Sequence, residues 1–185
     1  MHTLAWKLTQ SKLCTHLYIA PGNAGTALCG TNLQISTTDF DQIAAACRLH
    51  HIKMLIIGPE DPLVMGITDF IRAKEGLAHI HIIGPSKEAA QLEGSKAFAK
   101  RFMTDHGIPT AAFEKFSEEN YEEGIDYIKN HPLPVVLKAD GLAAGKGVVI
   151  CKNHVEALAE FELMVLRSKF GEAGRKVVIE EFMQG

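Results

Sequence analysis

The sequence has little that would mark a membrane, secreted or nucleic-acid-binding protein. No apolar run approaches the ~18 residues of a membrane span, and residues 1–10 follow a polar, helical pattern unlike a secretory signal. The four cysteines include no CxxC pair, so zinc-knuckle and dithiol motifs are excluded. The formal net charge of −3 gives no bulk attraction to nucleic acid or anionic lipid. We expect a cytoplasmic chain with reduced thiols, and neither nucleic acid nor membrane as a partner.

The composition indicates a folded chain without a metal centre. Of 185 residues, 46% are hydrophobic, which is too many for intrinsic disorder. The nine histidines are scattered, and only His50-His51 and His79-x-His81 are close in sequence. A metal held by His79 and His81 is the alternative, but no cysteine or carboxylate accompanies them. We therefore predict surface or edge histidines and no metal site in this chain.

The first half alternates short apolar runs with helical patterns. The apolar runs predict strands at 16–20, 53–58 and 79–84, each followed by a loop with glycine and proline. Helices are predicted at 39–49 and 63–74. Strand, loop, helix, strand is typical of a parallel sheet with crossover helices, where ligands bind at the carboxyl ends of the strands. The prediction is an α/β fold whose residues 1–99 form a parallel, Rossmann-like unit.

The second half follows another pattern. Helices are predicted at 95–106, 118–130 and 153–166, and strands at 113–116, 134–138, 148–151 and 176–180. This arrangement predicts a smaller α+β unit over residues 100–185, with a small subdomain at about 113–185. The chain opens on a helix and closes just after a strand, so we expect it to be cut at both ends.

The loop 139–147 carries the clearest chemical signal. It follows Lys138 at the end of an apolar strand, and it places Lys146 between Gly145 and Gly147. Glycine lets backbone N–H groups approach an anion, and a lysine adds a mobile charge suited to phosphate. No hydroxyl residue follows the lysine, so this is not a P-loop. We interpret it as a hairpin that closes over a nucleotide; a flexible structural hairpin is the alternative.

Three further features bear on this interpretation. Lys96 begins a predicted helix, Lys138 lies on a strand facing the hairpin, and residues 180–182 end the last strand. The two lysines, which come from separate elements, are placed to contact phosphates. Exposed backbone at the strand end is placed to hydrogen-bond the edge of adenine. Taken singly, each is equally a solvated lysine or an acidic strand exit.

In combination these motifs resemble the phosphoribosylamine–glycine ligase family, or glycinamide ribonucleotide synthetases, within the ATP-grasp enzymes of purine biosynthesis. The similar segments lie in order along the chain: Ala20–Ala27 (APGNAGTA), Gly58–Leu63 (GPEDPL), Ala90–Phe98 (AQLEGSKAF), Lys138–Val148 (KADGLAAGKGV) and Val178–Phe182 (VIEEF). The resemblance implies a pre-ATP-grasp unit followed by a partial ATP-grasp unit. It also implies that ATP phosphorylates glycine and that 5-phosphoribosylamine attacks the glycyl phosphate, giving glycinamide ribonucleotide, ADP and phosphate.

The resemblance also assigns binding residues. Those implied for ATP are Lys96, Lys138, Gly145, Lys146, Gly147, Glu180, Glu181, Phe182 and Met183. Those implied for phosphoribosylamine are Gly22, Asn23, Gly25, Thr26, Pro59, Glu60, Pro62, Gly84 and Pro85. Mg²⁺ or Mn²⁺ is implied as a cofactor, with its ligands, the glycine site and the ribose contact outside this chain. No catalytic residue is assigned.

The departures from the family pattern leave two alternatives open. Family members begin with a strand and a glycine-rich loop before the histidine matching His2, whereas here only Met1 precedes it. We therefore expect a piece of a monomeric ligase that is inactive alone. The alternatives are a non-catalytic remnant that binds a nucleotide or sugar phosphate, and another ATP-grasp carboxylate–amine ligase.

Overall fold

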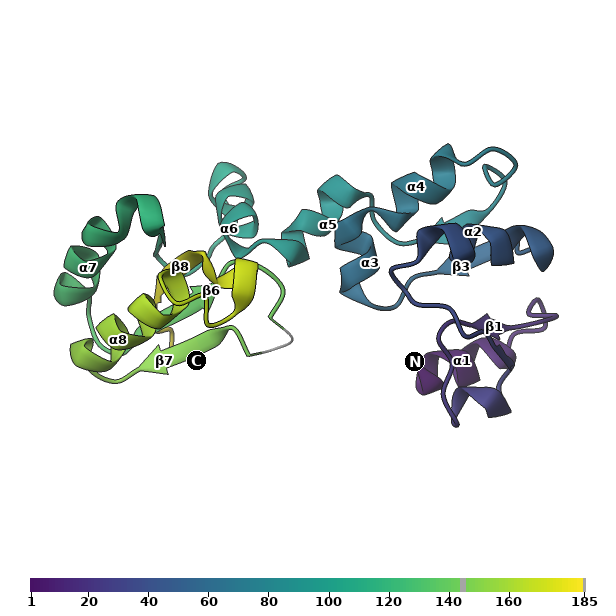
Figure 1. Cartoon of the computed structure of the whole chain (residues 1–185), viewed down its shortest axis with the longest axis horizontal. Coiled ribbons are helices and arrows are strands. Elements are labelled where there is room, and N and C mark those ends of the chain that lie inside the picture. Colours follow the sequence, from purple (N-terminus) through teal and green to yellow (C-terminus); the bar gives the residue numbers. More distant parts are fainter. Residues whose placement is uncertain (144–145, 185) are drawn as a thin grey trace. The chain divides into compact units, whose positions relative to one another are not determined.

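The chain folds into two compact units, Met1–Ala90 and Gln91–Gly185. The computed structural model describes residues 1–143 and 146–184. Each unit has its own sheet structure and its own core of buried apolar side chains. Figure 1 labels their helices and strands. The short strands of the first unit pair in parallel, and those of the second unit form an antiparallel sheet. Both agree with the predicted α/β and α+β units.

The first unit contains two pairs of parallel strands. Strand β1 pairs with β2, and β3 pairs with β4 in the register Met54↔His81 to Ile56↔Ile83. The elements are α1 (His2–Thr9), β1 (Tyr18–Ile19), β2 (Thr31–Asn32), α2 (Phe40–Leu49), β3 (Met54–Ile56), α3 (Glu60–Met65), α4 (Ile67–Ala73), β4 (His81–Ile83) and α5 (Lys87–Gly94), with a 3₁₀ turn at Thr26–Leu28. Helix α5 crosses the boundary between the units.

The prediction of one continuous helix at 63–74 is wrong. The structure has two helices, because Gly66 adopts a left-handed φ of 99° that ends α3 and precedes α4. Helix α3 also begins at Glu60, inside the segment interpreted as a loop. Proline is compatible with the first turn of a helix, so Pro62 does not exclude helix there. Strand β2 and helix α5 were not predicted.

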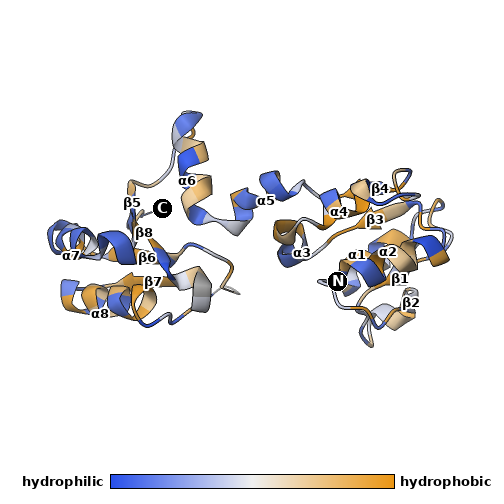
Figure 2. Cartoon of the chain, turned by 45° about the horizontal axis from the view of Figure 1, so that its top comes forward, coloured by the Kyte–Doolittle hydropathy of each residue, from blue (hydrophilic) through white to orange (hydrophobic). Residues whose placement is uncertain are grey.

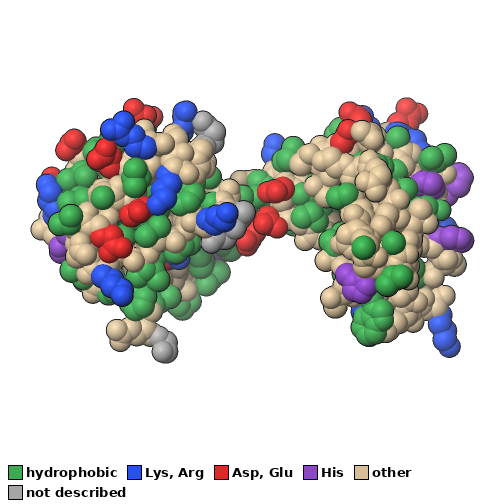
Figure 3. All heavy atoms as spheres, turned by 60° about the horizontal axis from the view of Figure 1, so that its bottom comes forward, with side chains coloured by type: hydrophobic (Ala, Val, Ile, Leu, Met, Phe, Trp, Pro, Cys, Tyr) green, Lys and Arg blue, Asp and Glu red, His purple; other side chains and the backbone are tan. Residues whose placement is uncertain are grey.

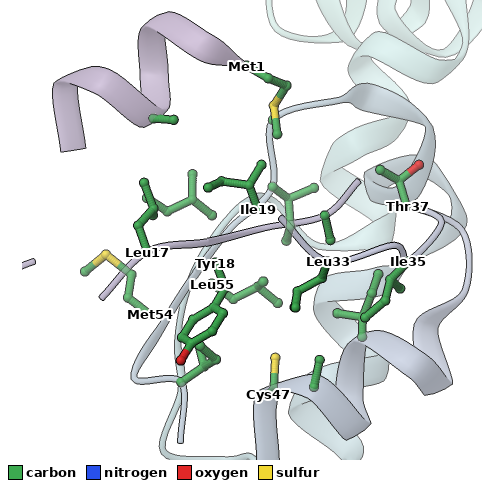
Figure 4. A pocket seen from close by; sticks show the side chains of 18 of the residues that line it. Met1, Leu17, Tyr18, Ile19, Leu33, Ile35, Thr37, Cys47, Met54 and Leu55 are labelled. Atoms are coloured by element: carbon green, nitrogen blue, oxygen red, sulfur yellow. The ribbon is translucent and has the colours of Figure 1, made fainter. Parts of the chain in front are cut away.

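The core of the first unit lies between its helices and β3–β4. Residues from α2 and α4, together with Leu77 and Ile80, form the buried cluster. Asp39 caps α2, since its carboxylate accepts a hydrogen bond from the Gln42 N–H at 3.0 Å. An apolar cavity of about 190 Å³ lies beside this core, lined by side chains of β1, β3 and α2 and by Met1. Figure 4 shows Ile19, Leu33 and Leu55 directed toward it.

The second unit is a four-stranded antiparallel sheet in the order β5-β8-β6-β7. Its elements are α6 (Lys96–Asp105), β5 (Phe113–Ser117), α7 (Tyr121–Asn130), β6 (Val135–Ala139), β7 (Val148–Cys151), α8 (His154–Val165) and β8 (Lys176–Glu181), with 3₁₀ turns at Glu118–Asn120 and Gly171–Gly174. Strands β6 and β7 form the predicted hairpin, in the register Val135↔Cys151 to Lys138↔Val148.

One face of this sheet carries the core. Alternate residues of β6 and β8, including Leu137 and Ile179, pack against α7 and α8 around Phe161. In Figure 2 the sheet strands and α8 are largely apolar, whereas α7 carries more polar residues. Lys138 and Glu180, which follow Leu137 and Ile179 in their strands, therefore belong to the opposite face of the sheet. Among the described residues, no helix has the length and apolarity needed to cross a bilayer.

Candidate functional site

The site centres on a cluster of three charged side chains, Lys100, Lys138 and Glu180, hereafter the Glu180 cluster. One carboxylate oxygen, Glu180 Oε2, lies 2.8 Å from Lys138 Nζ and 3.1 Å from Lys100 Nζ. The other oxygen, Oε1, is buried and has no hydrogen-bond partner among the described residues. A buried acceptor without a donor is uncommon, so this atom marks a place where a ligand donor would be accommodated.

The sheet and α6 position these three groups. Glu180 lies on β8 and Lys138 on the adjacent β6, where Lys138 is opposite Val178 and therefore diagonal to Glu180. Lys100 comes from α6, which follows the N-cap Ser95. The side chain of Glu180 is 5% exposed, that of Lys100 7% and that of Lys138 28%. The cluster thus has one fixed, buried cation and one that reaches the surface.

Asp140 joins the start of α6 to the end of β6. Its Oδ1 accepts hydrogen bonds from the Ala97 N–H at 2.7 Å and the Ser95 hydroxyl at 3.0 Å. Its backbone carbonyl accepts from the Lys96 N–H at 3.1 Å. A carboxylate at a helix N-terminus is favourable because the free N–H groups there carry partial positive charge. This carboxylate therefore holds the helix that carries Lys96 and Lys100 against the strand that carries Lys138.

Lys96 lies at the same end of the sheet. Its Nζ donates to the Gly141 carbonyl at 3.3 Å. Burial lowers the pKa of its ammonium group below the ordinary 10.5; Asp140 opposes this shift and the nearby Lys138 adds to it. The two predicted phosphate ligands, Lys96 and Lys138, therefore repel each other electrostatically. An anion between two ammonium groups relieves such repulsion.

The glycine-rich loop is partly described. Gly147 is buried, and its carbonyl accepts from the Ala139 N–H at 2.7 Å, closing the hairpin. A Cβ at Gly147 would lie 2.8 Å from the Ala143 Cβ, so the close approach requires glycine. Lys146 is exposed. Gly145, also predicted to bind phosphate, lies outside the described residues.

The predicted adenine segment leaves the sheet at the end of β8. Glu181 lies on the opposite face from Glu180, and its Oε1 accepts from the Ala112 N–H at 2.9 Å. Phe182 and Met183 follow the strand and are exposed. Of the four predicted adenine-pocket residues, only Glu180 contacts a predicted phosphate ligand, Lys138, among the contacts of the described residues. Phe182 and Met183 lie just after the end of the same strand, β8.

The predicted substrate residues of the first unit lie in the segments that follow β1, β3 and β4, with Glu60 and Pro62 in the first turn of α3. Pro59, Glu60 and Pro62 follow β3, and Gly84 and Pro85 follow β4, so they share the carboxyl edge of one parallel pair. The loop with Gly22, Asn23, Gly25 and Thr26 follows β1. Within it the Thr26 hydroxyl is used structurally, since it accepts from the Asn23 N–H at 2.7 Å and donates to Asn32 Oδ1 at 2.8 Å.

The start of α1 lies close to two of these loops. A Cβ on Gly25 would meet His2 Nδ1 at 2.5 Å, and one on Gly58 would meet Met1 Sδ at 3.1 Å. Only Pro59 and Pro62 of the predicted substrate residues line the apolar cavity. The polar loops and the cavity are therefore largely separate features of this unit.

Within the described part of the chain, the histidines are not gathered into a metal site. In Figure 3 those on the visible face of the first unit lie apart, and on the second unit basic and acidic side chains are intermixed. Over residues 1–143 and 146–184 there is no group of three histidine, cysteine or carboxylate side chains placed to hold a metal ion.

Sequence reasoning missed Lys100 and Asp140. Lys100 follows Lys96 by four residues and so lies on the same side of α6, but its partner Glu180 is far away in sequence. Asp140 was visible within the glycine-rich segment, two residues after Lys138. Its role as the link to α6 depends on the tertiary fold.

Comparisons with known proteins agree along the whole chain. The family model described as "Phosphoribosylglycinamide synthetase, N domain" matches residues 1–93, and "Phosphoribosylglycinamide synthetase, ATP-grasp (A) domain" matches residues 94–185. The phosphoribosylamine–glycine ligase of Pasteurella multocida is 48% identical over 186 residues, covering 100% of this chain and 42% of that protein. That of Yersinia pestis is 46% identical, with the same coverage. The chain thus spans less than half the length of these curated relatives.

Solved structures give the same result for the fold. The crystal structure of phosphoribosylamine–glycine ligase from Thermotoga maritima matches with a TM-score of 0.73 and 32% identity, covering 100% of this chain and 41% of that one. A biotin carboxylase from Campylobacter jejuni matches with a TM-score of 0.72 over 98% of this chain and 43% of that one. At 20% identity the second match shows a shared fold alone.

Proposed function

Because this chain belongs to the phosphoribosylglycinamide synthetase family, we propose that it provides the sugar-phosphate loops and part of the nucleotide site for ATP-dependent ligation of glycine to 5-phosphoribosylamine. The products are glycinamide ribonucleotide, ADP and phosphate, as a step of purine biosynthesis. The proposal places the chain in the cytoplasm, within a monomeric ligase, with small molecules as its partners. It takes residues 1–99 as a substrate domain and residues 100–185 as a partial ATP-grasp domain, with a small lid subdomain at about 113–185.

One observation supports the nucleotide site: the buried Glu180 Oε1 has no hydrogen-bond donor among the described residues, and the same carboxylate contacts Lys138, which interacts electrostatically with Lys96. A carboxylate oxygen accepts hydrogen bonds only, so it suits the exocyclic amino group of adenine and disfavours a carbonyl at that position. Lys138 and Lys96 then lie where the phosphates would extend from the base. The exposed residues Glu181, Phe182 and Met183 supply the further edge of the adenine pocket, and Lys146 with its flanking glycines closes over the phosphates.

The chemistry requires charge neutralisation and positioning. A carboxylate becomes an acyl donor only after its oxygen is converted into a phosphate leaving group, and ATP supplies that phosphoryl group when bound. Phosphoryl transfer depends mainly on orientation and on stabilising charge. Lys96 and Lys138 would hold and neutralise phosphate oxygens, and the hairpin would exclude water. We assign no ligand for Mg²⁺ or Mn²⁺ among the described residues.

The loops of the first unit are proposed to hold phosphoribosylamine. An added Cβ at Gly22, Gly25 or Gly84 would meet a neighbouring side chain, so these segments are closely packed. The carboxyl edge of β3–β4 and the start of α1 contribute to the same region of this unit. Its polar residues would bind ribose hydroxyls, and the free N–H groups at the start of α1 would favour phosphate.

Isothermal titration calorimetry of the purified chain with ADP tests the nucleotide site. Lys138→Ala should weaken ADP binding about tenfold or more, because a hydrogen bond to a charged group contributes about 1.5–3 kcal/mol. Lys129→Ala, on the remote helix α7, is the matched control and should leave binding unchanged. Absence of heat with the wild-type chain, or equal affinities for wild type and Lys138→Ala, would refute the proposed site.

A further inference from the structure

The two lysines of the Glu180 cluster are held very differently. Lys100 Nζ lies 2.7 Å from Thr110 Oγ1, 3.2 Å from the Ala111 carbonyl and 3.1 Å from Glu180 Oε2. These contacts use all three N–H donors of its ammonium group. Lys138 has one such contact within the described chain, to Glu180 at 2.8 Å, and its side chain is 28% exposed. Lys100 is therefore locked, whereas Lys138 is free to turn.

This difference matters when a nucleotide binds. If Lys138 turns toward a phosphate, it withdraws positive charge from a carboxylate that is 5% exposed. A buried charge without a partner is strongly unfavourable, so the carboxylate would resist the movement. Lys100 removes this obstacle because it remains on the same oxygen, Oε2, and keeps the carboxylate paired throughout. It also fixes the direction of the free oxygen, Oε1.

We propose that Lys100 is a positioning residue whose fixed ammonium group holds Glu180 in place and thereby releases Lys138 to bind the phosphates of an adenine nucleotide. The inference rests on the proposed nucleotide site and adds a residue to it. Lys100 itself need not touch the ligand. In the structure Lys138 contacts the carboxylate, and with a nucleotide bound it would contact phosphate, while the Lys100–Glu180 pair would stay the same.

The test compares ADP with adenosine, because only ADP presents phosphates. Calorimetry gives the ratio of the two affinities, which isolates the phosphate contribution from adenine binding. Lys138→Met should lower this ratio about tenfold. Lys100→Met should lower it to a similar extent although Lys138 is intact, because Glu180 would then retain Lys138. Lys129→Met should leave the ratio unchanged.

A double variant separates positioning from mere structural support. In Lys100→Met with Glu180→Gln, no carboxylate remains to retain Lys138, so the ADP-to-adenosine ratio should return toward the wild-type value. Removing both charges also avoids an unpaired buried charge, so this variant should fold even if Lys100→Met does not. A ratio that stays low in the double variant would overturn the inference.

The remaining outcomes are distinct. If the wild-type chain binds ADP better than adenosine and Lys100→Met has the same ratio, the inference is overturned and the proposed nucleotide site stands. If the wild-type chain binds neither compound, the proposed site itself fails, and the role of Lys100 with it. Hydrogen exchange of the lysine ammonium groups gives a ligand-free check: Lys100 protons should exchange more slowly than those of Lys138, and equal rates would contradict the fixed-cation argument.

Discussion

Replacing Glu180 with glutamine tests whether the second unit depends on the Glu180 cluster for stability. The substitution keeps the size and a hydrogen-bond acceptor but removes the negative charge. Lys100, 6% exposed, is then left with Thr110 and the Ala111 carbonyl, which are neutral. Its ammonium group becomes a buried cation without a counter-charge. We therefore expect Glu180→Gln to lower the free energy of unfolding of residues 91–185.

The magnitude follows from burial. Removing one partner of a buried ion pair costs about 3–5 kcal/mol, and the retained acceptor places this case near 3 kcal/mol. With a urea dependence of about 1–3 kcal/mol/M, the midpoint should fall by roughly 1–3 M. Far-UV circular dichroism follows the transition. The single tryptophan, Trp6, lies in the first unit, so its fluorescence reports separately on residues 1–90 and should not change.

Glu160→Gln provides the control. Its partner Lys169 is 2.6 Å away, but the two side chains are 22% and 37% exposed, so loss of this pair should cost at most about 1 kcal/mol. A loss below about 1 kcal/mol for Glu180→Gln, equal to that of the control, would refute the argument that the cluster is a desolvated ion pair. An increase in stability would refute it more strongly.

Two further predictions concern packing and protonation. Gly124→Ala would ordinarily stabilise a helix by about 1 kcal/mol, but the new Cβ would lie 2.5 Å from Phe161 Cζ. Overpacking should therefore make the variant about 1–2 kcal/mol less stable, as measured by urea unfolding. A variant more stable than the wild type would contradict this argument. Burial raises the pKa of the Cys151 thiol from 9.0 to about 11, so between these pH values the unfolded chain loses the proton first and stability should fall as pH rises. Cys151→Ala should show a shallower fall over that range, and an identical pH dependence would contradict the assignment.

Much of the fold was predictable because its strands are apolar and bounded by turn residues. Segments such as KMLIIG, PVVLK and KVVIE are recognisable as strands from their composition. The first contains β3, whereas β6 and β8 each extend one residue beyond the predicted segment. Strand β2, Thr31–Asn32, was missed because neither residue is apolar. The break at Gly66 depends on a left-handed φ that composition does not specify. Strand order β5-β8-β6-β7 follows from tertiary pairing, which local pattern does not encode.

The site was predictable only where the signal is local. The family assignment is confirmed by the comparisons, since two family models match residues 1–93 and 94–185. Lys96 and Lys138 were selected from their positions beside a glycine-rich hairpin; their roles remain predictions. Lys100 could not be selected, because one more lysine on a helix has no distinguishing pattern, and only the fold brings it to Glu180.

The hydrogen bonds of Asp140 bear on how this region can vary. Asp140, two positions after Lys138, accepts hydrogen bonds from the first turn of α6. These bonds fix the distance between the backbone at Lys96 and the backbone at Lys138. A substitution at either end that shifts the backbone would be transmitted to the other ammonium group. Replacing Asp140 should therefore alter the spacing of the two ammonium groups.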